Sequence, residues 1–224
     1  MASTKTDAVK LRIYRKIKTE IISGRKKPGE RLSIDDLKKE FGTSVSPVRD
    51  AFQMLSQEDL VTIKPRSGYY VTKVTLKELR DMLDMREILE LAAVVRAAER
   101  ITPEQIKELE SVHAGYTDDE DETYSRYTLE NQNFHTLMAK ASGNEELARQ
   151  VSRVHDRMAR FMIIVRSGHY MIDIHQKLID RLAAHDASGA RKTLKKELDQ
   201  AKTAIMERIM EEEAGSWHLG TVRE

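Results

Sequence analysis

Apolar residues along the first third of the chain recur at intervals that predict three short helices. The first begins at about Ala8, after polar residues 1–7 that we expect to be disordered, and it ends before Gly24. The second covers residues 34–41, with Ser33 as its N-cap. The third follows directly and has the most informative outward face.

That third helix combines an apolar face with an outward cation and amide. Ser46 is its expected N-cap and Pro47 its expected first residue, where the missing N–H costs nothing. The apolar face consists of Val48, Ala51, Phe52 and Leu55. Arg49 and Gln53 fall off this face, as in a helix that reads the DNA major groove. An ordinary amphipathic helix packed in a bundle would show the same pattern.

Two short segments with β-branched and aromatic residues follow, at residues 61–64 and 69–72. The intervening residues 65–68 include a proline and a glycine and predict a hairpin turn. Three helices and a two-stranded ribbon predict a winged helix-turn-helix DNA-binding domain over residues 8–74.

The pattern over residues 75–213 is helical throughout and predicts an all-α antiparallel helical bundle. We expect six helices, at residues 76–100, 102–116, 124–141, 145–166, 170–185 and 188–213. In the first of them we expect the following residues to point inward: Leu79, Met82, Leu83, Met85, Ile88, Leu89, Leu91 and Ala92. The fold class is therefore mainly α, with two domains and a tail at residues 214–224.

Charge separates the two domains. Residues 1–75 hold 16 Lys and Arg against 9 Asp and Glu, so +7 of charge lies there and −6 in the remainder, given the total of +1. A basic first domain indicates a polyanionic partner. No apolar run is long enough for a membrane helix, no signal peptide is evident and cysteine is absent, so we expect a cytoplasmic protein without a membrane partner.

Motifs in the first domain carry a family resemblance. They are Pro28, Gly29, Arg31, Leu32, Leu37, Phe41, Gly42, the run from Ser46 to Ala51, Leu55, and the run from Arg66 to Val71. Over residues 9–73 the chain resembles the N-terminal domain of GntR-family bacterial transcription regulators. The resemblance implies a homodimer on a palindromic operator in double-stranded DNA, with the wing near the minor groove.

Seven residues are the expected contacts to DNA: Arg31, Ser46, Arg49, Gln53, Lys64, Arg66 and Gly68. Many family members carry arginines near positions 35 and 45, where this chain has Asp35 and Val45. The fold prediction is unaffected, but the operator sequence does not carry over from relatives.

The second domain resembles the FCD effector-binding domain of the FadR subfamily, in its six-helix, VanR-like variant. The motifs are Asp84 to Arg86 with Leu89 and Glu90, then Asn131, Phe134, His135 and Met138, then Ala141, Ser142 and Asn144, and lastly His175, Leu178, Ile179, Asp186 and Ala190. The resemblance implies a bundle that binds a small effector, commonly next to a divalent metal.

Four polar residues are candidate metal ligands. Asn131 and His135 project from one helix face, His175 shares an apolar face, and Glu197 interrupts another, where a carboxylate is costly unless paired or metal-bound. The family usually has one aspartate and three histidines here, so Asn131 and Glu197 are departures. Two imidazoles and a carboxylate suit Zn, Ni, Mn or Fe. The alternative is a metal-free pocket in which Glu197 pairs with a histidinium or an arginine.

Arg86, Arg157 and Arg160 are candidate effector-binding residues, because arginine holds carboxylates bidentately. Interhelix salt bridges would explain them equally well. The remaining histidines have no partner at ligand spacing, and we expect them at the surface: His113, His155, His169, His185 and His218.

These features predict a transcription regulator, in the usual family sense a repressor, controlled by a small organic acid. No catalytic motif is present, so we do not expect an enzyme. One rival hypothesis is a metal-dependent helical enzyme with Glu197 as general base and a DNA-targeting domain. Another is a basic domain that binds RNA.

Overall fold

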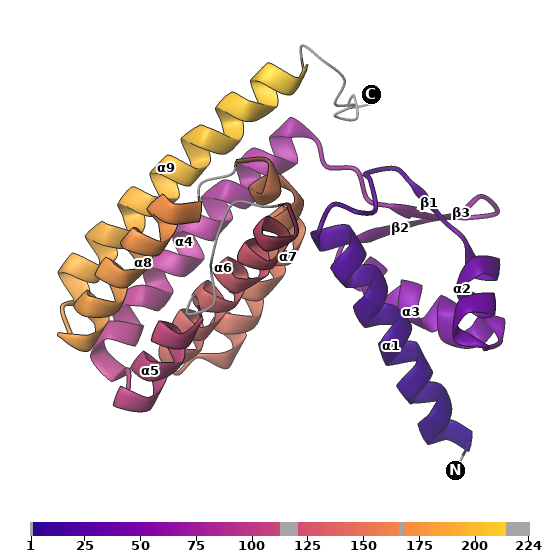
Figure 1. The fold of residues 1–224 in the computed structure, drawn as a ribbon, viewed down its shortest axis with the longest axis horizontal. Helices are drawn as coiled ribbons and strands as arrows, with labels where there is room; N and C mark the ends of the chain where they lie inside the picture. Colours follow the sequence, from indigo (N-terminus) through magenta and orange to yellow (C-terminus); the bar gives the residue numbers. More distant parts are fainter. Residues whose placement is uncertain (1, 113–120, 166–167, 214–224) are drawn as a thin grey trace. The chain divides into compact units, whose positions relative to one another are not determined.

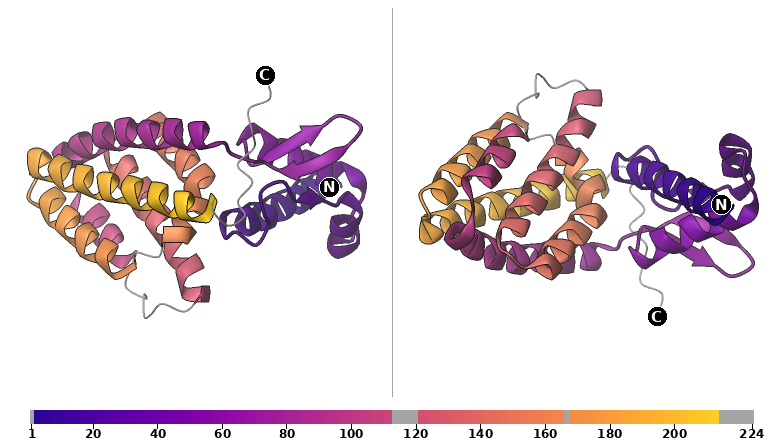
Figure 2. Two further views of the ribbon diagram at one scale, coloured as in Figure 1. Left: turned by 90° about the horizontal axis from the view of Figure 1, so that it is seen from above. Right: turned by 90° about the horizontal axis from the view of Figure 1, so that it is seen from below.

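The computed structural model describes residues 2–112, 121–165 and 168–213. The chain divides after Thr75 into two compact units, each with its own hydrophobic core. Figures 1 and 2 show a first unit of helices with a small sheet and a second unit built of helices alone. This confirms the predicted fold class, a winged helix-turn-helix followed by a helical bundle.

The first unit places three helices around a three-stranded sheet. Its elements are α1 (Ala2–Ile22), β1 (Arg31–Leu32), α2 (Ile34–Phe41), α3 (Val45–Gln57), β2 (Val61–Lys64) and β3 (Gly68–Val71). The sheet is antiparallel in the order β1-β3-β2, and Tyr70 of β3 lies opposite both Arg31 and Thr62. The predicted two-stranded ribbon therefore has a third strand, β1, where the sequence predicted only a turn.

Two predicted helix starts in this unit are wrong. Helix α1 begins at Ala2 instead of Ala8, because its polar first turns have no apolar stripe for periodicity to find. Helix α3 begins at Val45, so Ser46 lies inside the helix and is not its N-cap. Pro47 is tolerated there because the first N–H groups of a helix have no acceptor within it.

The predicted ends of α2 are confirmed by cap geometry. The Ser33 hydroxyl accepts a hydrogen bond from the backbone N–H of Asp36. At the other end, Gly42 adopts a left-handed conformation with φ of 57°, which few residues other than glycine adopt without cost. Both ends of this helix could therefore be predicted because each depends on one residue type.

The second unit contains the six predicted helices. They are α4 (Leu76–Arg100), α5 (Pro103–Ser111), α6 (Asp121–Ala141), α7 (Glu145–Val165), α8 (Gly168–Ala183) and α9 (Ala187–Glu213). Helix α4 packs against α6, α7, α8 and α9. Thr102 caps α5 through a capping box with Gln105. This helix ends at Ser111, earlier than expected, and residues 113–120 lie outside the described part of the chain.

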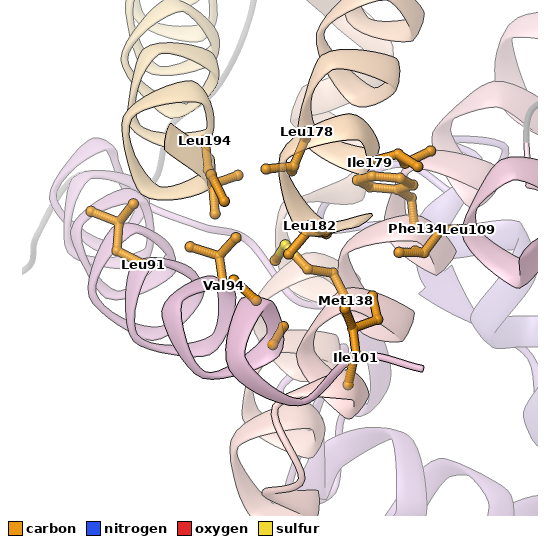
Figure 3. Packing of buried hydrophobic residues seen from close by; sticks show 14 of the residues in the cluster. Leu91, Val94, Ile101, Leu109, Phe134, Met138, Leu178, Ile179, Leu182 and Leu194 are labelled. Atoms are coloured by element: carbon orange, nitrogen blue, oxygen red, sulfur yellow. The ribbon is translucent and has the colours of Figure 1, made fainter. Parts of the chain in front are cut away.

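Figure 3 shows how α4, α6, α8 and α9 share one core, in which Val94, Phe134, Met138, Leu182 and Leu194 converge. Burial of such side chains is the main source of the bundle's stability.

The inward face of α4 differs from the prediction. Met85 and Ile88, expected to point inward, are 48% and 65% exposed. Arg86 and Glu90 take inward positions instead and are 2% and 0% exposed. A count of apolar residues alone cannot find this face, because two of its members are charged.

Candidate functional site

Five of the seven predicted DNA contacts line one groove of the first unit, with a volume of about 720 Å³. They are Arg31, Arg49, Lys64, Arg66 and Gly68. Arg31 comes from β1, Arg49 from α3, and the other three from the hairpin of β2 and β3. Ser46 and Gln53 are exposed on α3 but are not among the groove residues.

The groove offers cationic groups that are not engaged by the protein. Within the described residues, the guanidinium groups of Arg31, Arg49 and Arg66 form no hydrogen bond or ion pair. The Lys64 ammonium lies 4.8 Å from the ring centroid of Tyr70. Asp35 is the one carboxylate in the lining. Several free donors and a positive charge match the phosphate backbone of a nucleic acid.

Three of the four predicted metal ligands, His135, His175 and Glu197, meet in the core of the second unit, and Asn131 lies one turn before His135 on the same helix. Asn131 and His135 come from α6, His175 from α8 and Glu197 from α9, and each is at most 2% exposed. Oε1 of Glu197 lies 3.0 Å from Nε2 of His135 and 3.3 Å from Nε2 of His175. The His175 ring stacks on Phe134 with a centroid distance of 3.9 Å, which holds its orientation. The structure thus brings together residues that are up to 62 positions apart in the sequence, His135 and Glu197.

Three further buried residues complete this cluster, and the sequence assigned a role to only one of them, Arg86. Oε1 of Glu90 accepts hydrogen bonds from Nε of Arg86 and from Nε2 of His155, both at 2.7 Å. His155 was predicted at the surface, which is wrong, because it is 3% exposed. Its place between Val151 and Met158 on an apolar stripe was the signal that could have found it.

The cluster fixes the protonation of its members. Burial alone would raise the pKa of Glu90, but Arg86 and then His135 hold it well below the usual range. Burial opposes a charge on His135, yet Glu90 and Glu197 raise its pKa to about 9. Burial, assisted by Arg86, lowers the pKa of His155 to about 4.

The pKa values of Glu197 and His175 are shifted by the same two effects, burial and neighbouring charges. Burial alone would raise the pKa of Glu197, but His135 and His175 lower it. Burial lowers the pKa of His175. At neutral pH and without a bound cation, the charges of Arg86 and His135 therefore balance those of Glu90 and Glu197.

The donor atoms of the cluster fit a metal ion. One group that could hold a cation consists of His135, His175 and Glu197. Oδ1 of Asn131 and Oε2 of Glu197 are buried without a hydrogen-bond partner among the described residues. Two imidazole nitrogens and two unused oxygens form a donor set suited to a divalent transition metal.

The predicted effector arginines differ in position. Arg86 lies in the cluster, with Nη2 3.2 Å from Nε2 of His135 and 3.8 Å from Oε1 of Glu197. Arg157 is half-buried on α7, and the Arg160 side chain lies outside the described part of the chain.

The other histidine predictions are partly tested. His185 is exposed, as expected. The side chains of His113, His169 and His218 lie outside the described residues.

Two family models match the chain. The model described as bacterial regulatory proteins, gntR family, matches residues 9–71, and the FCD domain matches residues 81–200. The repressor RspR of Escherichia coli (strain K12) is 26% identical over 222 residues, covering 95% of this chain and 94% of RspR. The regulator YdhC of Bacillus subtilis (strain 168) is 28% identical over 193 residues, covering 81% and 84%.

Solved structures show the same fold. E. coli McbR/YncC superposes with a TM-score of 0.76 at 23% identity, covering 90% of this chain and 98% of that chain. A GntR regulator from Rhodococcus sp. RHA1 has a TM-score of 0.70 at 22% identity, covering 88% of this chain and 97% of that chain.

None of the helices in the described part of the chain has the length and apolarity needed to cross a bilayer.

Proposed function

The chain belongs to the gntR family of bacterial regulatory proteins and carries an FCD domain, and from this premise we propose that it is a ligand-responsive repressor. It binds a palindromic operator as a homodimer, and a small organic acid in the helical bundle controls its affinity for DNA. The membership itself makes it a DNA-binding transcription regulator; the dimer, the operator and the effector are the proposed part.

The groove of the first unit supports the DNA-binding part of the proposal. Arg31, Arg49 and Arg66 are exposed and free to contact phosphates or base edges. A dimer presents two such grooves related by a two-fold axis, which matches two half-sites of a palindrome.

The convergence of His135, His175 and Glu197 in a buried core, with the unpaired Oδ1 of Asn131 one turn from His135, is the observation that carries the effector part. These residues would hold a divalent Zn, Ni, Mn or Fe ion, which would supply a positive centre for an anionic ligand. With the histidines neutral, such an ion together with Arg86, Glu90 and Glu197 leaves a buried net charge of +1. The carboxylate of an organic acid would neutralise it, and Arg86 offers that carboxylate a second cation.

An effector controls DNA affinity only if it binds two states of the protein differently. We would measure fluorescence anisotropy of a duplex from the protein's own promoter region, with Zn²⁺-loaded protein and a series of C2–C6 mono-, di- and tricarboxylic acids. At least one acid should weaken DNA binding about 10-fold or more, and His175→Gln should bind the duplex normally but lose the response. Normal affinity with no response to any acid would contradict organic-acid control.

The rival functions predict different results in the same preparation. A metal-dependent enzyme would convert one of the acids into a product, which chromatography of the incubated mixture would reveal. An RNA-binding protein would show equal affinity for structured RNA and the duplex in a competition experiment. We expect thermal stabilisation by the effector without product, and preference for the duplex.

A further inference from the structure

His135 lies between two carboxylates, one at each ring nitrogen. Nε2 faces Oε1 of Glu197 at 3.0 Å, and Nδ1 lies 2.7 Å from Oε2 of Glu90. The pair lies at ion-pair distance without the alignment of a hydrogen bond. An unprotonated Nδ1 would still bring its lone pair close to a carboxylate oxygen, which is repulsive. The contact is therefore favourable only when Nδ1 carries the proton, so Glu90 selects the ring tautomer.

Glu90 is itself held firmly in place. Nε of Arg86 and Nε2 of His155 both donate to its Oε1, from α4 and α7 respectively. These two donors leave Oε2, which has no hydrogen bond of good geometry with any described residue, to face His135. All four side chains are at most 3% exposed, so water does not compete strongly for these contacts.

We propose that Glu90 is a positioning residue for the metal centre, and that His155 and Arg86 hold Glu90 in the orientation it needs. With Nδ1 protonated by its contact to Glu90, His135 keeps the Nε2 lone pair for the ion. A carboxylate behind a ligating histidine also raises the basicity of that ligand. The inference rests on the proposed metal centre but concerns residues that are not its predicted ligands.

The departure at Asn131 makes this arrangement more important. An amide at that position brings no charge, so Glu197 is the only anion among the four predicted ligands. Glu90 supplies a second negative charge through His135.

Direct ligation through Glu90 and His155 is the competing arrangement, because Glu90, His135 and His155 also form a group that could hold a cation. The hydrogen bonds argue against it. Oε1 of Glu90 already accepts two donors, and Nε2 of His155 is the donor in one of them. A metal at this place would have to displace both bonds. A metal at Nε2 of His135 leaves both bonds to Glu90 intact and requires only that Nη2 of Arg86, 3.2 Å from this nitrogen, moves aside.

The test is Zn²⁺ affinity of the full-length, chelator-stripped protein, measured by competition with a chelating dye. Glu90→Gln keeps the size and an acceptor oxygen but removes the charge, and its affinity should fall about 10- to 100-fold. Glu87→Gln is the matched control, because it makes the same change three residues away on α4, where Glu87 pairs with Lys195 at 3.5 Å. This control should bind Zn²⁺ like the wild type.

A second variant and two spectroscopic readouts separate positioning from folding. His155→Leu removes one donor to Glu90 while keeping all four predicted ligands and an apolar side chain against the His135 ring, on which His155 stacks at 4.8 Å; it should weaken Zn²⁺ binding several-fold. Nitrogen-15 shifts of the His135 ring in the Zn²⁺-loaded wild type should show the proton on Nδ1. The Co²⁺ absorption spectrum of Glu90→Gln should keep the wild-type shape, because the set of ligands is unchanged.

The outcomes distinguish this inference from the proposal on which it rests. If the wild type binds neither Zn²⁺ nor any of Ni²⁺, Mn²⁺ and Fe²⁺ in its place, the metal centre fails. If the wild type binds Zn²⁺ and Glu90→Gln binds it equally tightly, the metal centre stands and the positioning role is wrong. An altered Co²⁺ spectrum in Glu90→Gln would overturn positioning in favour of direct ligation.

Discussion

The two units of the protein use charged side chains in opposite ways. In the winged-helix unit, Arg31, Arg49 and Arg66 are exposed and make no ion pair with a described residue. In the bundle, Arg86 and Glu197 are almost fully buried and each faces opposite charges. Unpaired cations at the surface can bind the phosphates of a nucleic acid. A buried cluster whose charges already balance can accept a charged ligand only if that ligand takes the place of one of the existing charges. The comparison can be tested one unit at a time.

The largest effect should come from removing one buried charge. In metal-free Glu197→Ala, the cations of Arg86 and His135 lose one of their two carboxylates, and we expect the free energy of unfolding to fall by about 3–5 kcal/mol. Urea denaturation at pH 7 measures it. Glu207→Ala, at an exposed position of the same helix, is the control and should change little. A Glu197→Ala protein as stable as wild type would show that the cluster is not mutually compensating.

The stability of the metal-free protein should fall on the alkaline side. The pKa of His135 is about 9 when folded, against 6.5 as its ordinary value. The contribution of His135 to the free energy of unfolding is therefore complete below pH 6.5, and roughly 3 kcal/mol of it is lost as the pH rises through 9.

His155, with a pKa of about 4, acts in the opposite sense, because its contribution to stability is lost as the pH falls from 6.5. Denaturation at several pH values should show this decline, and His135→Gln should remove its alkaline part; a flat wild-type profile would contradict the charge assignment.

The exposed charges should affect binding and leave stability alone. Arg49 is the main cation on the outward face of α3, and Arg49→Ala should weaken operator binding by about 1–3 kcal/mol, enough at the upper end to nearly abolish the complex in the cell. The unfolding free energy should stay within about 0.5 kcal/mol of wild type. Arg25→Ala, an exposed arginine that does not line the groove, is the control. Wild-type operator affinity of Arg49→Ala at physiological salt would show that the wrong face has been assigned to DNA.

The smallest effect separates two serines at the starts of neighbouring helices. Ser33→Ala removes the hydroxyl that accepts the N–H of Asp36, so thermal unfolding should show a loss of about 1 kcal/mol. Ser46 lies within the first turn of α3 and is not its cap, so Ser46→Ala should be nearly neutral for stability. Equal losses of stability in the two variants would show that the Ser46 hydroxyl acts as a cap.

Much of the fold could be predicted because it depends on local patterns. Helices with an apolar stripe were found, as were the ends marked by Ser33, Gly42 and Thr102, where one residue type makes the cap. Strand β1 was missed because two residues are too few to show a period. The first turns of α1 were missed because they are polar.

The site could be predicted only in part. Family resemblance pointed to Asn131, His135 and His175, and a carboxylate on an apolar stripe pointed to Glu197. The same reasoning applies to Glu90 and His155, which are the polar members of buried helix faces. Their hydrogen bond joins residues 65 positions apart, so no sequence spacing reveals it. Burial of single polar residues is visible in a sequence, but the partner that makes burial tolerable is visible only in the fold.

The metal content of the wild-type protein tests the central claim about the bundle most directly. Protein purified without chelator, reloaded in turn with Zn²⁺, Ni²⁺, Mn²⁺ and Fe²⁺ and then dialysed, is measured by elemental analysis beside His175→Gln treated identically. We expect about one ion per chain in the wild type for at least one metal, and very little in the variant. Wild-type protein that retains none of the four metals would contradict it and leave a metal-free network of Arg86, Glu90, His135 and Glu197.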